Sequence, residues 1–264
     1  MYDFNYQKAS SLDDAKSKFS GAEDARYMAG GMTLLPVLKQ RLDQPSDVVD
    51  LGFLDDLKGI SEEGGNIVIK AMTVHQAVNT SDVVKSKIPA LAHLAGTIGD
   101  PMVRNRGTIG GSLANNDPAA SYPSAVLALN ATIHTDSRTI AADDFFTGMF
   151  DTALDMGELI TKVSFPIPEK AGYCHFPNPA SRYPIVGVFV AKTKDGARVA
   201  VTGAGSCVFR VPEMEKALTA NWSPDAVADV KVPADGLNED IHASPEYRAH
   251  LITVMAKRAV QSAG

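Results

Sequence analysis

The sequence predicts an α+β protein of three consecutive units, and three observations support this prediction. Residues 1 to about 60 alternate helical patterns with short apolar runs, as in a small α/β unit. Five prolines within residues 166–184 place a boundary near residue 168, because proline disfavours helix interiors and central strands. Beyond that boundary, two strand-like runs and two amphipathic helical patterns predict an α+β unit.

Helix caps and glycines define the elements of the first unit. Ser11 is expected to cap a helix that ends at Gly21. Strands are expected at residues 26–30 and 47–52, with a helix over residues 33–40 between them.

The second unit begins with a hairpin around Gly64 and Gly65. Thr73 and Ser81 are expected to cap two short helices, and Pro118 is expected to start another. The remaining elements are a helix over residues 89–99, a hairpin followed by a short helix over 131–146, and a strand over 158–168. In the third unit we expect antiparallel strands at 185–193 and 197–209, then helices at 211–220 and 244–261.

The composition excludes several classes of protein. The 264 residues carry a net charge of −6, and this acidic balance disfavours nucleic acid as a partner. No apolar stretch is long enough to span a bilayer, and the first residues lack the layout of a signal peptide. Cys174 and Cys207 lie far apart, which fits a reducing cytoplasm and leaves no cysteine set for an iron–sulfur cluster within this chain.

Two glycine turns are the strongest functional signal. AGGMTLLP (29–36) and GTIGGSLANNDP (107–118) both lie where a strand is expected to lead into a helix. Successive backbone N–H groups in such turns form anion-binding concavities, so the pair suits a ligand with two phosphates. Neither turn is a P-loop or a GxGxxG fingerprint. A purely structural turn is the common explanation of a single glycine pair.

The flanks of these turns resemble a known family. AGGMTLLPVLKQRL and IGDPMVRNRGTIGGSLANNDPAASYPSAVLALNA are similar to the FAD-binding medium subunits of molybdenum hydroxylases. The resemblance extends through PASRYPIVGV and SPEYRAHL in the last third of the chain. It implies a FAD-binding PCMH-type fold of two α/β subdomains, residues 1–57 and 58–167, followed by a C-terminal α+β domain, residues 168–264.

The resemblance also implies a cofactor site. The FAD pyrophosphate is expected between the two turns, with the isoalloxazine facing the C-terminal domain. The cofactor-binding residues that it implies are Ala29, Gly30, Gly31, Met32, Thr33, Leu34, Ile98, Thr108, Ile109, Gly110, Gly111, Ser112, Asn116, Asp117, Ser121, Ile160, His175 and Tyr183. No catalytic residue and no metal ligand is expected in this chain.

Several positions leave alternatives open. Relatives often carry His or Gln then Ser where this chain has Met32–Thr33, and commonly an Asp where it has Ser121. Tyr183 could instead be an interdomain core residue, and His175 an ordinary loop histidine. Arg104 and Arg106 could contact phosphate, but they are expected instead to brace the second turn or to face a partner subunit. His75 is expected to be structural or solvent-exposed.

The expected function follows from the resemblance. A large subunit would oxidise the substrate at a molybdenum cofactor, and a small subunit with two [2Fe–2S] clusters would pass the electrons to FAD in this chain. We expect a dimer of heterotrimers in the cytoplasm, with no nucleic acid and no membrane span. The alternatives are a stand-alone flavin reductase of the same fold and a flavin-poor scaffold subunit.

Overall fold

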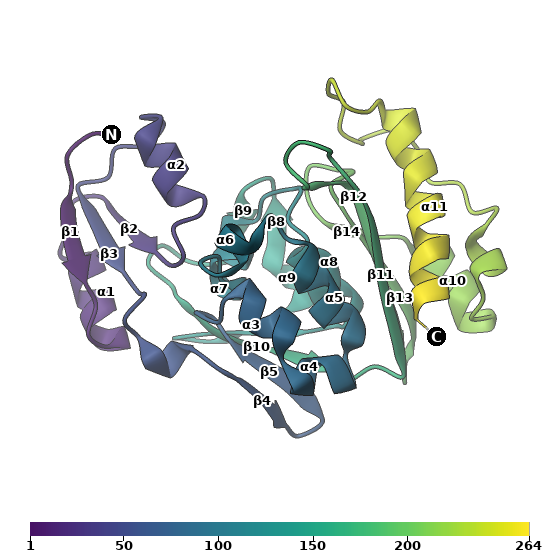
Figure 1. Ribbon diagram of the computed structural model, residues 1–264, viewed down its shortest axis with the longest axis horizontal. Coiled ribbons are helices and arrows are strands. Elements are labelled where there is room, and N and C mark those ends of the chain that lie inside the picture. Colours follow the sequence, from purple (N-terminus) through teal and green to yellow (C-terminus); the bar gives the residue numbers. More distant parts are fainter. Residues whose placement is uncertain (264) are drawn as a thin grey trace.

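The first unit is a parallel three-stranded sheet at one end of the molecule, in a computed structural model that describes residues 1–263 (Figure 1). Its strands lie in the order β1 (Asn5–Lys8), β3 (Asp47–Asp50), β2 (Ala25–Met28). Helices α1 (Leu12–Ser20) and α2 (Leu34–Lys39) connect them. The Ser11 cap is confirmed, since its side chain accepts a hydrogen bond from the Asp14 N–H. Strand β1 was not predicted, because its residues NYQK give no apolar signal.

The second unit contains a five-stranded antiparallel sheet, which follows the 3-10 turn η1 (Asp55–Leu57). The strand order is β4 (Ile60–Glu63), β5 (Asn66–Lys70), β10 (Ile160–Pro166), β6 (Thr132–Thr135), β7 (Thr139–Ala141). The predicted hairpins over β4–β5 and β6–β7 are confirmed.

Short helices fill the chain between β5 and β6. They are α3 (His75–Thr80), α4 (Asp82–Lys87), α5 (Pro89–Thr97), α6 (Pro101–Arg104), α7 (Ile109–Asn115) and α8 (Tyr122–Ala128). After β7 come α9 (Ala142–Phe145) and the strand pair β8 (Phe146–Gly148) and β9 (Asp151–Thr152).

Two predicted helix starts in this unit are wrong. Val74, not Thr73, is the N-cap of α3, because the Thr73 hydroxyl bonds to the backbone N–H and C=O of Gly59 instead. Pro118 does not begin a helix, since its carbonyl accepts hydrogen bonds from Thr202 and Gly203 of the third unit.

The third unit is a four-stranded antiparallel sheet with two long helices. Its strands are β11 (Lys170–Pro177), β12 (Pro184–Thr193), β13 (Gly196–Thr202) and β14 (Phe209–Arg210), in that order. Helices α10 (Pro212–Ala220) and α11 (Pro245–Ser262) confirm the predicted pair, with η2 (Pro224–Val227) between them. Strand β11 was not predicted, because it lies in a proline-rich stretch. The prolines do not prevent the strand, because β11 is an edge strand and its only proline is its last residue.

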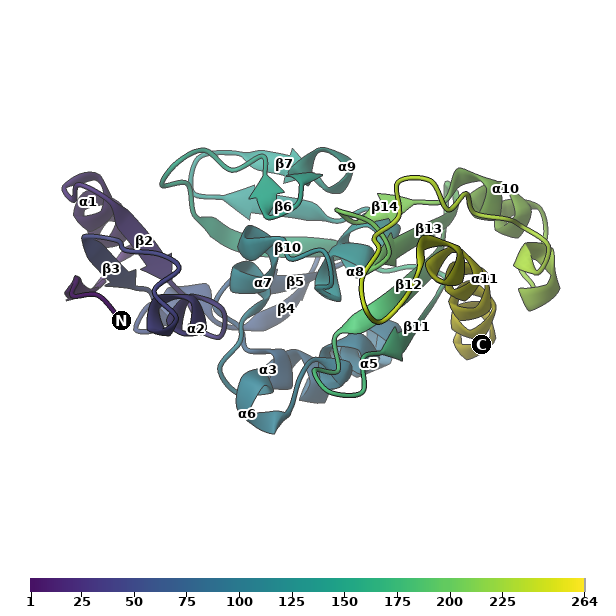
Figure 2. The same ribbon diagram turned by 90° about the horizontal axis from the view of Figure 1, so that it is seen from above.

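The sheets lie one after another along the molecule, and the helices of the second unit fill the space between the last two (Figures 1 and 2). Phe189 of β12 packs into the same core cluster as Ile69 of β5 and Val126 of α8. The alternate residues Val188 and Val190 face the opposite side and pack with Met255 of α11. Packing is therefore continuous across residue 168, and the domain boundaries stay a prediction. No described helix is long and apolar enough to cross a membrane.

Candidate cofactor-binding site

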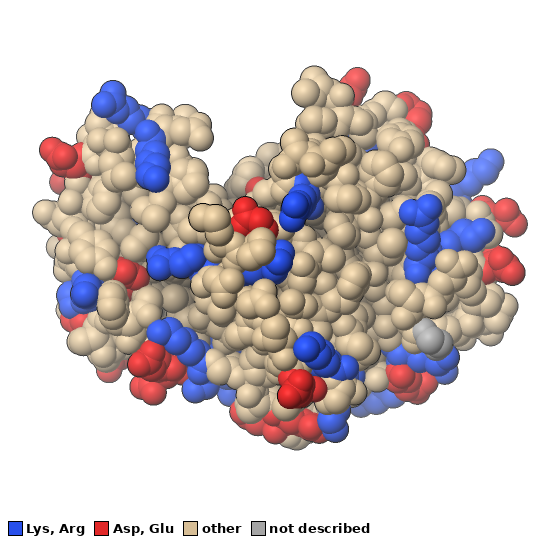
Figure 3. All heavy atoms as spheres, viewed as in Figure 1, with Lys and Arg blue, Asp and Glu red and all other residues tan. Residues whose placement is uncertain are grey.

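A cleft opens between the first unit and the rest of the molecule, visible as the deep notch in Figure 3. The cavity has a volume of about 780 Å³ and is lined by residues from all three units. Both glycine turns contribute to its wall. Its size is in the range of natural cofactor pockets.

The first glycine turn presents a row of unused hydrogen-bond donors. It follows β2 and leads into α2, and Gly31 takes a φ of +73° that suits glycine. Over the described chain, no backbone N–H of residues 30–34 donates to a protein acceptor. These residues all line the cavity. An anion placed there would therefore meet several free N–H groups.

The second glycine turn differs from the first, because most of its N–H groups are already paired. The N–H of Ile109 donates to Thr73 and that of Gly110 to Ala71, over 3.1 and 2.9 Å. Within the turn, the N–H of Gly111 donates to the Thr108 hydroxyl and that of Ser112 to the Thr108 carbonyl. We expected both turns to bind phosphate through N–H groups. The geometry assigns that capacity mainly to the first turn.

The glycines of the two turns are needed for packing within the protein. A Cβ added to Gly30 would lie 2.0 Å from the Arg106 carbonyl oxygen. One added to Gly110 would lie 2.7 Å from the Cβ of Ala71. The glycines thus bring the turns against each other and against β5, and in doing so they shape the cavity floor.

Most of the residues that the sequence suggested for cofactor binding lie around this one cavity. Those that line it are Ala29, Gly30, Gly31, Met32, Thr33, Leu34, Ile98, Thr108, Gly110, Gly111, Ser112, Asp117, Ser121, Ile160 and Tyr183. Their contact with a cofactor stays a prediction.

Ile109, Asn116 and His175 do not line the cavity. Ile109 is fully buried in the core of the second unit. The buried Asn116 amide donates to the carbonyls of Gly148 and Asp151, so it holds the β8–β9 turn. His175 is half-buried on β11 and stacks on Tyr173, with ring centroids 5.5 Å apart.

A hydrogen bond from Tyr173 holds the side chain of Ser121 in place. The buried Tyr173 hydroxyl donates to the Ser121 Oγ over 3.2 Å. Because the Ser121 oxygen accepts this bond, its own hydrogen is free to donate into the cavity. Burial raises the pKa of Tyr173, which keeps the tyrosine protonated as the donor.

Tyr183 stands at the mouth of the cavity on the loop between β11 and β12. Its side chain is 49% exposed, which excludes the alternative that it is a core tyrosine. The Asn178 side chain shapes this loop by accepting hydrogen bonds from the N–H groups of Ala180 and Ser181. Burial and the charge of Asp117 raise the pKa of Tyr183, so its ring is neutral at physiological pH.

His75 is a cavity residue that sequence reasoning missed. It is the first residue of α3, after the segment 71–74 that follows β5, and no local sequence signal marks it as a cavity residue. Its ring packs on Tyr122 at 5.3 Å between centroids, and its buried Nδ1 has no hydrogen-bond partner among residues 1–263. Burial and the charge of Arg104 lower the pKa of His75 to about 4, so the imidazole is neutral.

Arg104 braces the α5–α6 connection, which precedes the second turn, and not the turn itself as predicted. Its guanidinium donates to the carbonyls of Ile98 and Gly99, both at 3.2 Å, and to the Gln76 side chain. These bonds fix the α5–α6 connection at the cavity wall.

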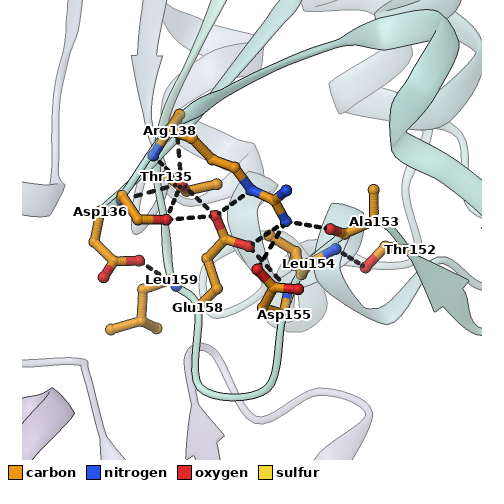
Figure 4. Close-up of polar contacts among 10 residues, drawn as sticks. Thr135, Asp136, Arg138, Thr152, Ala153, Leu154, Asp155, Glu158 and Leu159 are labelled. Atoms are coloured by element: carbon orange, nitrogen blue, oxygen red, sulfur yellow. Dashed lines mark hydrogen bonds and ion pairs between the residues drawn. The ribbon is translucent and has the colours of Figure 1, made fainter.

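A polar cluster supports the opposite wall (Figure 4). Glu158 accepts from Arg138 Nη2 at 2.9 Å and from the Thr135 hydroxyl at 2.6 Å. The bond from Arg138 is the main cause that lowers the pKa of Glu158 to about 2. Nearby, Asp136 accepts from the Leu159 N–H at 2.8 Å and pairs with Lys16 of α1. The cluster thereby fixes the segment that ends in Ile160 and ties it to the first unit.

Comparisons with known proteins identify the family of this chain. Residues 2–168 match the family described as the FAD binding domain in molybdopterin dehydrogenase. The nicotine 6-hydroxylase medium subunit of Paenarthrobacter nicotinovorans is 38% identical, over 98% of this chain and 96% of its own. The carbon monoxide dehydrogenase medium chain of Afipia carboxidovorans is 33% identical, over 98% and 96%.

A solved structure shares the fold. The structure of reconstituted CO dehydrogenase from Oligotropha carboxidovorans aligns with a TM-score of 0.91 and 31% identity, over 99% of this chain and 98% of that chain. Its agreement confirms the α+β FAD-binding fold that the sequence predicted. The chain therefore belongs to the family of FAD-binding domains of molybdopterin dehydrogenases, as an oxidoreductase subunit of the medium-chain kind with FAD as its cofactor.

Proposed function

We propose that this chain carries electrons through FAD within a molybdenum-containing hydroxylase or dehydrogenase. Electrons would arrive from the [2Fe–2S] clusters of a small subunit and leave to a terminal acceptor, while a large subunit oxidises the organic substrate. The observation that carries the proposal is the row of free N–H groups at residues 30–34, which faces a cavity of about 780 Å³. The relatives named as medium subunits and medium chains support it.

The residues of this chain would position the cofactor and tune its surroundings. FAD, when bound, supplies one- and two-electron redox chemistry. The N–H groups of residues 30–34 would hold the diphosphate, and Ile98 and Ile160 would supply apolar walls. Ser121 would donate a hydrogen bond, and the exposed ring of Tyr183 would cover the isoalloxazine.

The assembly that we propose is a dimer of heterotrimers in the cytoplasm. Each heterotrimer would contain this chain, the iron–sulfur subunit and the molybdenum subunit. Two widely separated free cysteines in this chain are consistent with a reducing compartment.

The proposal can be tested by mixing components without oxygen. The full chain is loaded with FAD and mixed with the chemically reduced iron–sulfur subunit, and the visible flavin band is followed. We expect bleaching that requires the iron–sulfur subunit. Bleaching by a nicotinamide nucleotide alone would support a stand-alone reductase, and a chain that takes up no FAD would support a scaffold. Oxidation of an organic substrate by this chain alone would refute the proposal.

A further inference from the structure

A second, smaller cavity shares a wall with the first. Its volume is about 370 Å³, against about 780 Å³ for the first. Residues that line both cavities are Asp117, Ala119, Ser181, Tyr183 and Pro184. A molecule in the second cavity would therefore lie next to whatever occupies the first, on the side of the third unit.

Two exposed aromatic rings line this second cavity. Phe150 and Tyr183 are 57% and 49% exposed. Large aromatic side chains gain most from burial, so a pair left in solvent around one cavity points to a planar ligand that stacks on them.

Two residues at the same place have strained backbone conformations. Phe150 has a φ of +54° and Arg182, next to Tyr183, a φ of +64°. A non-glycine residue with such a positive φ is sterically strained. The Phe150 conformation is held by Asn116, whose carbonyl accepts the Phe150 N–H at 3.2 Å and whose amide donates to the carbonyls of Gly148 and Asp151. Strain that the surroundings enforce in this way is typical of functional sites.

Charge and size restrict the class of ligand. The guanidinium of the buried Arg248 donates to Asp240 at 2.7 Å and to the carbonyls of Ile185 and Gly203, and only its Nε has no partner among the described residues. Asp117 adds a second carboxylate to the cavity. His242 completes the titratable groups of the cavity apart from Tyr183. Such a wall offers no cradle for a diphosphate. The cavity also has less than half the volume of the one that suits a dinucleotide, so its ligand should be small, planar and uncharged.

We propose that the second cavity binds the terminal electron acceptor, and that this acceptor is a quinone whose ring stacks between Phe150 and Tyr183. This inference rests on the proposed function. The quinone takes up two electrons and two protons, one at each carbonyl oxygen, and leaves as the hydroquinone. The reduced flavin loses the same two electrons and two protons.

The test compares two oxidants on the full chain loaded with FAD and reduced without oxygen. A water-soluble short-chain ubiquinone analogue probes the cavity, and ferricyanide, which needs no stacking site, serves as the reference. Phe150→Ala removes the ring, and Phe150→Gly removes it while tolerating the positive φ. Phe53→Ala is the matched control, because Phe53 is 54% exposed and lines neither cavity.

Reoxidation by the quinone should saturate, and both Phe150 variants should raise its half-saturating concentration by roughly fivefold to tenfold, as expected for one lost aromatic contact. Phe150→Tyr should restore it. The ferricyanide rate and the Phe53→Ala variant should be unchanged. Calorimetric titration of the oxidised chain with the quinone should show the same rise in dissociation constant without any turnover.

Several results would overturn the inference while leaving the proposed function intact. One is quinone reoxidation that does not saturate, and another is an equal response of wild type and both Phe150 variants. Saturable, Phe150-dependent binding of a nicotinamide nucleotide in place of the quinone would also reject it. Failure of the chain to take up FAD would instead reject the proposed function itself.

Discussion

Gly30 packs directly against the backbone of Arg106, so that a Cβ on Gly30 would lie 2.0 Å from the Arg106 carbonyl oxygen and 2.9 Å from the Cα of Gly107. The first glycine turn therefore rests on the residues that lead into the second. This contact joins two segments about 75 residues apart in sequence and forms the cavity floor between the first and second units.

Gly30→Ala should consequently damage both stability and cofactor binding. The methyl group meets rigid backbone, so we expect a loss of about 1–3 kcal/mol in the free energy of unfolding. The displaced turn should raise the FAD dissociation constant by at least about tenfold. Urea unfolding and flavin fluorescence titration measure the two effects. Gly148→Ala is the control, because its Cβ would lie 3.8 Å from the nearest atom. Wild-type affinity in Gly30→Ala would show that the contact is dispensable.

Ser121→Ala should weaken FAD binding without unfolding the protein. The variant loses the hydroxyl that Tyr173 orients toward the cavity. One neutral hydrogen bond contributes about 1 kcal/mol, which corresponds to roughly a fivefold rise in dissociation constant. Tyr173→Phe should act in the same direction but less, because the Ser121 hydroxyl remains and only its orientation is lost. Equal affinities of Ser121→Ala and wild type would remove Ser121 from the binding site.

The two glycine turns could be predicted from the sequence because they are local signals, whereas cavity residues such as Ile98, Ile160 and Tyr183 were implied only by the family resemblance. A glycine pair after an apolar run marks a strand-to-helix turn wherever it occurs. Whether the backbone N–H groups of each turn are free or hydrogen-bonded could not be predicted. The N–H groups of Ile109 and Gly110 donate to the carbonyls of Thr73 and Ala71, which are far away in the sequence. Only the three-dimensional structure shows that the first turn keeps its donors free and that most donors of the second are paired.

Strand β1 and the cavity position of His75 were not predicted for the same reason. Strand β1 is polar and exists because it pairs in parallel with β3, some 40 residues further along. His75 looks like any scattered histidine in the sequence, and becomes a cavity residue only when β5 and the second glycine turn meet. Non-local pairing decides both, and a single sequence carries no direct record of it.

The neutral imidazole of His75 predicts a pH dependence of stability. Burial and Arg104 lower its pKa to about 4 in the folded protein, against about 6.5 in an unfolded chain. As the pH falls from about 6.5 to 4, the unfolded chain takes up a proton that the folded protein does not. The free energy of unfolding of the FAD-free chain should therefore decrease in this range, by up to roughly 3 kcal/mol.

His75→Gln should flatten this decrease in urea unfolding followed from pH 7 to pH 4. His93→Gln is the matched control, since His93 is exposed on α5. A pH profile that is identical in His75→Gln and wild type would mean that His75 titrates alike in both states.

The Glu158 cluster predicts a second, more acidic transition. Its pKa is lowered to about 2, mainly by Arg138, against about 4.3 in an unfolded chain. The stabilisation from the ionised carboxylate is thus complete above pH 5 and is lost as the pH falls toward 2. Glu158→Gln should cost roughly 2 kcal/mol at pH 7, as for charged hydrogen bonds, and should remove this part of the profile. Because Glu158 and Ile160 both line the cavity, FAD release should follow the same pH range in wild type.

Glu169→Gln is the control, since the exposed Glu169–Lys192 pair should contribute less than about 1 kcal/mol. If Glu158→Gln costs no more than Glu169→Gln, the cluster in Figure 4 does not stabilise the cavity wall.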